Sequence, residues 1–140
     1  MKRKSSVAGT KVSFSKGAPR SLRLAWGATL SWMLDVANQE GIEVRKVEVH
    51  WHKDLYGRKC PLGEADATMN EIMLCTHIYD KDTIIHELAH LGSVGVHGAS
   101  WSRKFLELIT KYLSGQELEV AVFMACRDYK EVSKHIADYT

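Results

Sequence analysis

Two histidines and a glutamate lie one helical turn apart near the middle of the chain. The stretch from Thr83 to Gly92 reads TIIHELAHLG. In a helix, His86 and His90 lie on the same face and Glu87 lies just beside it. Two imidazoles can bind one metal ion and leave Glu87 near its open coordination position, which is the physical meaning of the H-E-x-x-H signature of metallopeptidases. We therefore predict a hydrolytic zinc site in which His86 and His90 bind the metal and Glu87 is the catalytic residue.

A third metal ligand is expected after this helix. His97 follows beyond Gly92, and the intervening Ser93-Val94-Gly95-Val96 is expected to form a loop that returns it toward the first two histidines. Glu107, on the next predicted helix, is the alternative third ligand. The other interpretations of the motif are a helix with no metal and a metal site that is only structural.

The composition favours one folded, water-soluble domain. The chain has 140 residues, of which 45% are hydrophobic and 26% are charged. No run approaches the roughly 18 apolar residues of a membrane-spanning helix, so we expect no membrane contact. The cysteines are odd in number and form no C-x-x-C pair, which is typical of a reducing compartment and predicts a cytoplasmic protein.

Positive charge is concentrated at the N-terminus. Residues 1–34 contain seven Lys or Arg and no acidic residue, whereas the rest of the chain contains 12 basic and 17 acidic residues. Residues 1–18 are predicted to be a flexible basic arm, and 19–140 a single domain. The arm is either a solubilising tail or a contact for the phosphates of nucleic acid.

Hydrophobic periodicity predicts an α+β fold. A helix is expected to open at Pro19 or Ser21, reach about Asn38 and stop at Gly41. The predicted strands are 42–51, with a bulge at Arg45-Lys46, and a hairpin of 64–68 and 71–76. The H-E-x-x-H helix follows, capped by Asp80 or Asp82. Two C-terminal helices are expected at 101–113 and 116–138, the first of them capped by Ser100.

Two further features, a pair of histidines on a strand and the apolar stripe of the last helix, each allow two interpretations. His50 and His52 share one strand face, which allows either a second metal site or, as we prefer, histidines at the solvent rim. The stripe of the last helix lacks strong heptads, so it is expected to cover the core of a monomer rather than a dimer face.

The order of these elements resembles that of the SprT-like zinc metallopeptidases. The resemblance lies in His86-Glu87-Leu88-Ala89-His90, a loop, and then His97-Gly98-Ala99-Ser100-Trp101, where Trp101 replaces the usual phenylalanine. It implies a minimal zincin fold, with a small sheet of about three strands packed by an N-terminal helix, the H-E-x-x-H helix and C-terminal helices. It also implies Zn²⁺ bound by His86, His90 and His97, with Glu87 catalytic.

The activity implied by the motif and the resemblance is hydrolysis of peptide bonds in an intracellular protein substrate. The spacing does not match the metzincin pattern. Zinc endoribonucleases with three histidine ligands lack a glutamate at the second motif position, so Glu87 argues against that class. Tyr79, Tyr112 and His135 are the candidates considered for the residue that stabilises the oxyanion. The alternative function is a nucleic-acid or regulatory binding protein built on a zincin scaffold.

Overall fold

The structure is a computed structural model of the chain, and it describes residues 9–51, 63–75 and 81–139. It is an α+β fold with five α-helices and a mixed sheet of four strands in the order β1-β2-β4-β3. The elements are β1 (Lys11–Phe14), α1 (Arg20–Glu40), β2 (Lys46–His50), β3 (Gly63–Asp66), β4 (Glu71–Cys75), α2 (Lys81–Leu91), α3 (Ala99–Tyr112), α4 (Gly115–Asp128), α5 (Lys130–His135) and the 3₁₀ helix η3 (Ile136–Tyr139).

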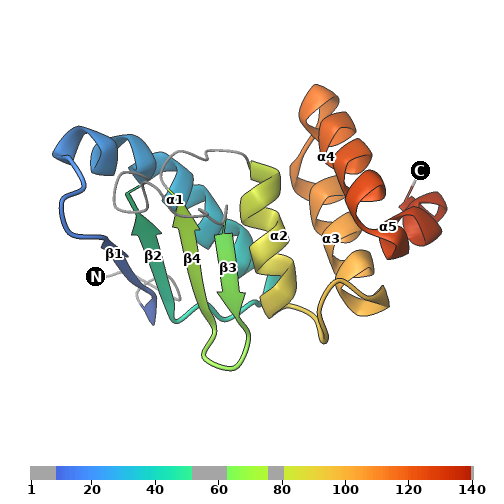
Figure 1. Cartoon of the computed structure of the whole chain (residues 1–140), viewed down its shortest axis with the longest axis horizontal. Helices are drawn as coiled ribbons and strands as arrows, with labels where there is room; N and C mark the ends of the chain where they lie inside the picture. Colours follow the sequence, from blue (N-terminus) through green and yellow to red (C-terminus); the bar gives the residue numbers. More distant parts are fainter. Residues whose placement is uncertain (1–8, 52–62, 76–80, 140) are drawn as a thin grey trace.

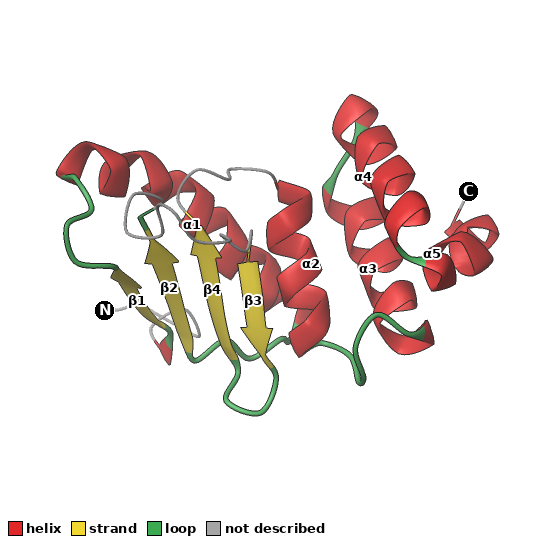
Figure 2. Cartoon of the chain, in the orientation of Figure 1, coloured by secondary structure: helices red, strands yellow, loops and turns green. Residues whose placement is uncertain are grey.

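The sheet joins two parallel pairs and one hairpin. β1 pairs with β2 and β2 with β4 in parallel, whereas β3 and β4 are antiparallel neighbours. Parallel β1 and β2 need a long crossover, which α1 provides. Figure 1 shows α1 behind the sheet, α2 beside β3, and α3 to α5 stacked beyond α2. Figure 2 shows the strands and α1 at one end of the molecule and α3 to α5 at the other, with α2 between them.

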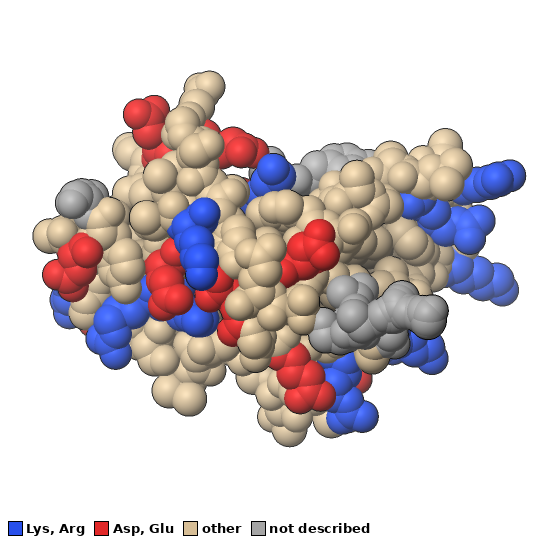
Figure 3. Space-filling model, turned by 180° about the vertical axis from the view of Figure 1, so that it is seen from behind, with Lys and Arg blue, Asp and Glu red and all other residues tan. Residues whose placement is uncertain are grey.

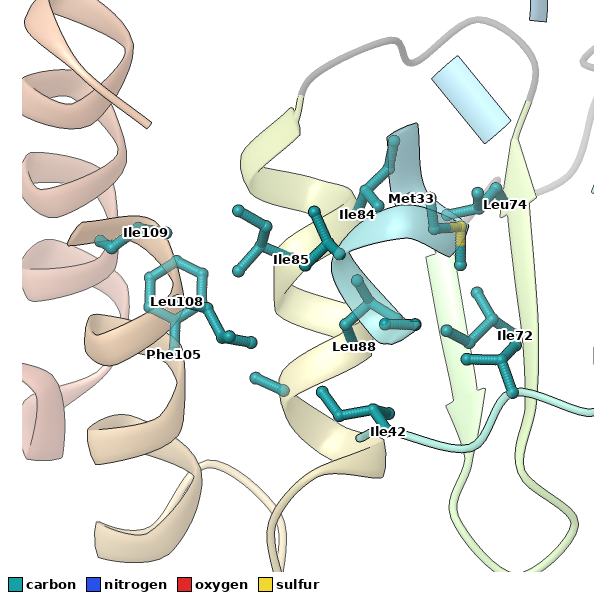
Figure 4. Packing of buried hydrophobic residues seen from close by; sticks show 14 of the residues in the cluster. Met33, Ile42, Ile72, Leu74, Ile84, Ile85, Leu88, Phe105, Leu108 and Ile109 are labelled. Carbon is teal, nitrogen blue, oxygen red and sulfur yellow. The ribbon is translucent and has the colours of Figure 1, made fainter. Parts of the chain in front are cut away.

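The helix with the H-E-x-x-H motif is buried on two sides. Ile84 and Leu88 point toward β4 and α1, where they lie near Met33, Ile72 and Leu74 (Figure 4). Ile85 points the other way, toward Phe105, Leu108 and Ile109 of α3. Because side chains three and four positions apart share a face, His86 and His90 lie together between these two packed faces, and His86 also lies against Trp101 of α3. α2 is thus clamped between the sheet layer and the C-terminal helices.

A polar cluster at the end of α1 holds α3 in place. The side chain of Glu40 is only 6% exposed and accepts hydrogen bonds from Lys111 Nζ at 2.7 Å and Tyr112 Oη at 2.6 Å. Both bonds favour the ionised carboxylate and lower the pKa of Glu40. The C-terminal end of α3 is therefore tied to the end of α1, and α3 carries Trp101 and Phe105, whose rings lie against His86 of α2.

The prediction for the first helix is confirmed, but that for the N-terminal arm is wrong in part. α1 begins after Pro19 and ends at Gly41, which has a φ of 68° that suits glycine. Residues Lys11–Phe14, expected in a flexible arm, form the edge strand β1. Their Val-Ser-Phe alternation is too short to stand out from the sequence, and it is the pairing with β2 that makes it a strand.

The strand expected over 42–51 begins later, at Lys46. The backbone of the preceding residues has other partners: the Ile42 N–H closes the end of α1 by donating to the Ala37 carbonyl, and the Val44 carbonyl accepts from Thr10 Oγ1. The hairpin is confirmed as β3 and β4, and the sheet has four strands where about three were expected.

The long helix expected over 116–138 is divided into α4, α5 and η3. The break is at Tyr129, whose φ of −133° and ψ of 110° are extended. Apolar residues keep helical spacing across this point and no Gly or Pro marks it, so the sequence carries no signal for the break. Among the described helices, none is long and apolar enough to cross a membrane.

Candidate metal centre

Three imidazoles from two segments converge on one point. His86 and His90 project from successive turns of α2, and His97 comes from the loop between α2 and α3. The Nε2 atom of His97 lies 3.0 Å from Nε2 of His86 and 3.1 Å from Nε2 of His90. In the part of the chain that the structure describes, these three residues are the one group of His, Cys, Asp or Glu side chains close enough to hold a metal ion.

The distances between the Nε2 atoms suit a small cation that binds nitrogen ligands, such as Zn²⁺. Zn–N bonds of about 2.0–2.1 Å in a tetrahedral site put the nitrogens about 3.3 Å apart. The distances of 3.0 and 3.1 Å are close to that value. Three imidazole donors leave one tetrahedral position open, which is the arrangement of catalytic rather than structural zinc sites.

The protonation states also favour a metal. Burial, together with the charges of His90 and His97, lowers the pKa of His86 to about 3. Burial and the charge of His97 lower the pKa of His90 to about 4, and burial lowers the pKa of His97 as well. All three rings are therefore neutral near pH 7, and neutral imidazole is the form that binds a metal.

The ring of Trp101, from the first turn of α3, packs against all three histidine rings. Its side chain is fully buried, and its ring centroid lies 4.7 Å from those of both His86 and His97 and 5.5 Å from that of His90. Its indole Nε1 donates a hydrogen bond of 3.2 Å to the carbonyl oxygen of His86, which fixes α3 against α2. A phenylalanine at this position could not make this hydrogen bond.

Tyr129 covers the centre from the C-terminal side. Its ring stacks on His97 with centroids 4.3 Å apart and lies 5.6 Å from the ring of His86. Burial, with smaller contributions from Asp128 and Glu87, raises the pKa of its phenol, which therefore stays protonated near neutral pH. Sequence analysis missed this residue, because it assigned Tyr129 to the interior of a continuous helix and to its core stripe.

Glu87 is buried beside the histidine cluster. It is only 5% exposed, and burial together with the charge of Glu64 raises the pKa of its carboxyl to about 7. Strand β3 passes very close: a methyl group at Gly63 would lie 3.0 Å from Oε2 of Glu87 and 3.2 Å from Cγ. Glycine at 63 therefore allows the edge strand and the carboxylate to approach each other.

An open cleft of about 680 Å³ gives access to the site. This volume lies within the range of typical ligand pockets. One wall is strand β3 and the residue after it, Gly63 to Ala67, and the other is formed by His86, Glu87 and His90 of α2 with the loop from Gly95 to His97. The metal ligands and the sheet edge thus face the same space.

The other residues considered from the sequence lie elsewhere. Glu107, the alternative third ligand, lies 3.5 Å from Lys104 and outside the histidine cluster. Tyr112 donates to Glu40, and His135 lies 3.5 Å from Glu131, so each is engaged away from the cluster. His50 pairs with Glu48 at 3.1 Å. His52 and Tyr79 lie outside the described residues.

The cap expected for α3 differs from the one observed. α3 begins two residues earlier than predicted, with Gly98 at the N-cap position, and Ser100 Oγ instead accepts a hydrogen bond from the backbone N–H of Val94. Ser100 therefore closes the loop that carries His97. Asp82 lies in the first turn of α2, and Asp80 is outside the described residues.

Comparison of the chain with protein-family models, with curated proteins and with solved structures finds no match.

The first prediction concerns metal content. The purified protein should bind one Zn²⁺ per chain, and His97→Ala should weaken binding by more than the roughly 10- to 100-fold that follows loss of a group which only orients a ligand. His135→Ala, a histidine outside the cluster, is the matched control and should bind normally. Isothermal titration calorimetry, with Zn²⁺ added to each protein after its metal has been removed, measures both affinities. Equal affinity of the wild type and His97→Ala would contradict the assignment.

The second prediction concerns Glu87 and the stability of the metal-free protein. Its pKa of about 7 in the fold exceeds the ordinary value of 4.5, so the folded state binds the proton more tightly. Glu87 therefore does not lower the free energy of unfolding below pH 4.5. As the pH rises from 4.5 through 7, its ionisation lowers that free energy, by about 3 kcal/mol in total. Glu87→Gln should stabilise the metal-free protein at pH 8 and have little effect on it at pH 4.5, as measured by chemical denaturation. A destabilised variant at pH 8 would oppose this.

Proposed function

We propose that this protein is a zinc-dependent metallopeptidase of the minimal zincin type, resembling the SprT-like family. The observation that carries the proposal is the convergence of three neutral imidazoles, with Nε2 atoms 3.0 and 3.1 Å apart, next to a buried glutamate one position after the first ligand. This is the donor set and the acid that hydrolytic zinc sites use. His86, His90 and His97 are the ligands in this proposal.

A bound Zn²⁺ would supply a Lewis acid that polarises the scissile carbonyl and makes water easier to deprotonate. Glu87 accepts a proton from the attacking water and delivers it to the leaving nitrogen. Its burial suits both steps, because a carboxyl with a raised pKa can give the proton back. The positive charge of a cation at the histidines favours ionised Glu87 at the start of the reaction.

The outer edge of β3 is the proposed binding strand for the substrate. β3 pairs only with β4, and no described strand pairs with its other edge, where a further strand could add. This edge and the histidines line the same cleft. An extended peptide that adds to β3 by β-augmentation would therefore pass the metal centre, which favours a polypeptide over a compact small molecule.

Tyr129 is the proposed stabiliser of the developing oxyanion. It lines a second hollow of about 300 Å³ that also borders His86 and Glu87. A protonated phenol stacked on His97 is a neutral hydrogen-bond donor at the metal centre, as the transition state for acyl transfer requires. This role replaces the earlier candidates Tyr112 and His135, which are engaged elsewhere.

The basic end of the molecule is a proposed contact for nucleic acid that takes no part in catalysis. Lys and Arg side chains gather at the sheet end of the molecule (Figure 3), where exposed Lys11, Lys16, Arg20 and Arg23 belong to β1, the following turn and the start of α1. Salt-sensitive DNA binding that is lost when Lys16, Arg20 and Arg23 are replaced by Gln would favour this contact, and unchanged binding would exclude it.

The experiment that tests the proposed function is cleavage of an unfolded protein such as casein by the zinc-loaded wild type and by Glu87→Gln. The variant should keep its metal and lose at least about 10²-fold in rate, because the proton acceptor is gone while the ligands remain. Unchanged cleavage by metal-loaded Glu87→Gln would refute the proposal. Absence of cleavage by a fully loaded wild type across unfolded substrates would also count against it.

Tyr129→Phe separates the chemical role of the phenol from its packing. The phenylalanine ring can still stack on His97, so the fold and the zinc affinity should be retained. Loss of one oxyanion donor should lower kcat about 10²-fold and leave KM nearly unchanged. A kcat equal to that of the wild type would restrict Tyr129 to packing.

A further inference from the structure

Among the described residues, no helix lies on one face of the sheet, which we call the open face. Along β2 and β4, the buried residues Val47, Val49, Ile72 and Leu74 point toward the helices. The alternate residues must point to the other face, which is turned toward the viewer in Figure 1 while α1 lies behind. Directly paired residues share a face, and the register pairs Glu64 with Met73, Asp66 with Glu71, and Lys46 with Glu71.

This open face is acidic and continuous with the metal centre. Four carboxylates on it line the cleft together with the three histidines, and Lys46 is the one lysine or arginine among the described residues of the lining; the carboxylates are Glu48, Glu64, Asp66 and Glu71. A bound divalent cation would still leave the acidic residues in excess. The cleft therefore attracts cationic groups and repels polyanions.

On the edge strand β3, the carboxylate of Glu64 and the second oxygen of Asp66, Oδ2, are available for a ligand among the contacts of the described residues. Glu48 is paired with His50, and Asp66 accepts two backbone N–H groups with one of its oxygens, Oδ1. Within the described chain, neither Glu64 nor Glu71 forms an ion pair.

A strand added to the outer edge of β3 would meet these carboxylates in a fixed pattern. Side chains directly opposite each other on neighbouring strands lie about 4.5–5.5 Å apart and on the same face. Glu64 and Asp66 are separated by one residue and point to the open face. The substrate residues opposite them are therefore also separated by one residue, and both point away from α2.

We propose that the substrate is a basic polypeptide segment with Lys or Arg at two alternate positions, whose cationic side chains lie against Glu64 and Asp66 when the segment pairs with β3. This proposal rests on the proposed peptidase function and names its substrate class. It also gives separate roles to the two oppositely charged regions of the molecule. The acidic cleft would bind the substrate, and the basic end lies apart from the cleft.

The test compares three peptides of equal length that carry Lys, Ser or Glu at two alternate positions. At low salt, the zinc-loaded wild type should cleave the Lys peptide with a kcat/KM about tenfold above that of the Ser peptide, and the Glu peptide should be the poorest. The preference should fall strongly at 0.5 M NaCl, because exposed charge pairs are screened.

Charge reversal makes the test specific to the cleft. In Glu64→Lys the order of the Lys and Glu peptides should invert, and in Glu64→Gln the preference for Lys should fall about threefold. Glu119→Lys is the matched control, because Glu119 is an exposed acid on α4 that does not line the cleft. The ratio of two peptides within one variant cancels any general effect on catalysis.

Binding separates failure of this inference from failure of the proposed function. Zinc-loaded Glu87→Gln should bind the fluorescent Lys peptide more tightly than the Glu peptide, and adding Glu64→Lys should reverse the order. Glu64-dependent binding without any cleavage by the wild type would keep the basic-segment site and overturn the peptidase. Cleavage with no preference, or with a preference that Glu64→Lys does not alter, would overturn this inference and keep the peptidase.

Discussion

The convergence of three unprotonated imidazoles is the constraint on which the rest of the structure depends. Their Nε2 atoms are held 3.0 and 3.1 Å apart in a partly buried place, where burial keeps the rings neutral. Three nitrogen lone pairs at this spacing are poorly satisfied by one another and well satisfied by a cation. The surrounding residues act to hold this arrangement: Trp101 below it, Tyr129 over His97, and α2 clamped on both sides.

The fold solves a conflict within α2. A helix that carries metal ligands must be rigid, yet it must leave those ligands accessible. Here Ile84 and Leu88 anchor α2 to the sheet and Ile85 anchors it to α3, so that His86 and His90 are fixed in place and still line the cleft. The tie between Glu40 and Lys111 secures α3 at its far end, and Trp101 secures it at the near end.

Sequence reasoning succeeded where the chemistry is local. His86, Glu87 and His90 lie on one helix, so their spacing alone predicts their arrangement, and Gly92 and Gly98 on either side of the loop made the return of His97 a natural expectation. The structure places His97, and not Glu107, beside His86 and His90, as that choice requires. The α+β class, the first helix and the hairpin were also predictable, because their periodicity and end signals agree.

Sequence reasoning failed where distant segments decide the local structure. β1 is a strand because β2 pairs with it, and Ile42 and Val44 stay outside β2 because their backbone groups bond to Ala37 and Thr10. Tyr129 interrupts a well-patterned helix at the place where its ring meets His97. No periodicity encodes these contacts, and for this reason the residue that covers the metal centre was missed.

X-ray absorption at the zinc edge tests the central claim most directly, because it reports the donor atoms around the metal whether or not any substrate is known. For the protein loaded with one equivalent of Zn²⁺, we expect three imidazole nitrogens at about 2.0–2.1 Å and one further light atom. The signal of the His97→Ala protein should lose one imidazole. A shell of sulfur at about 2.3 Å, or a shell with no imidazole scattering, would contradict the account.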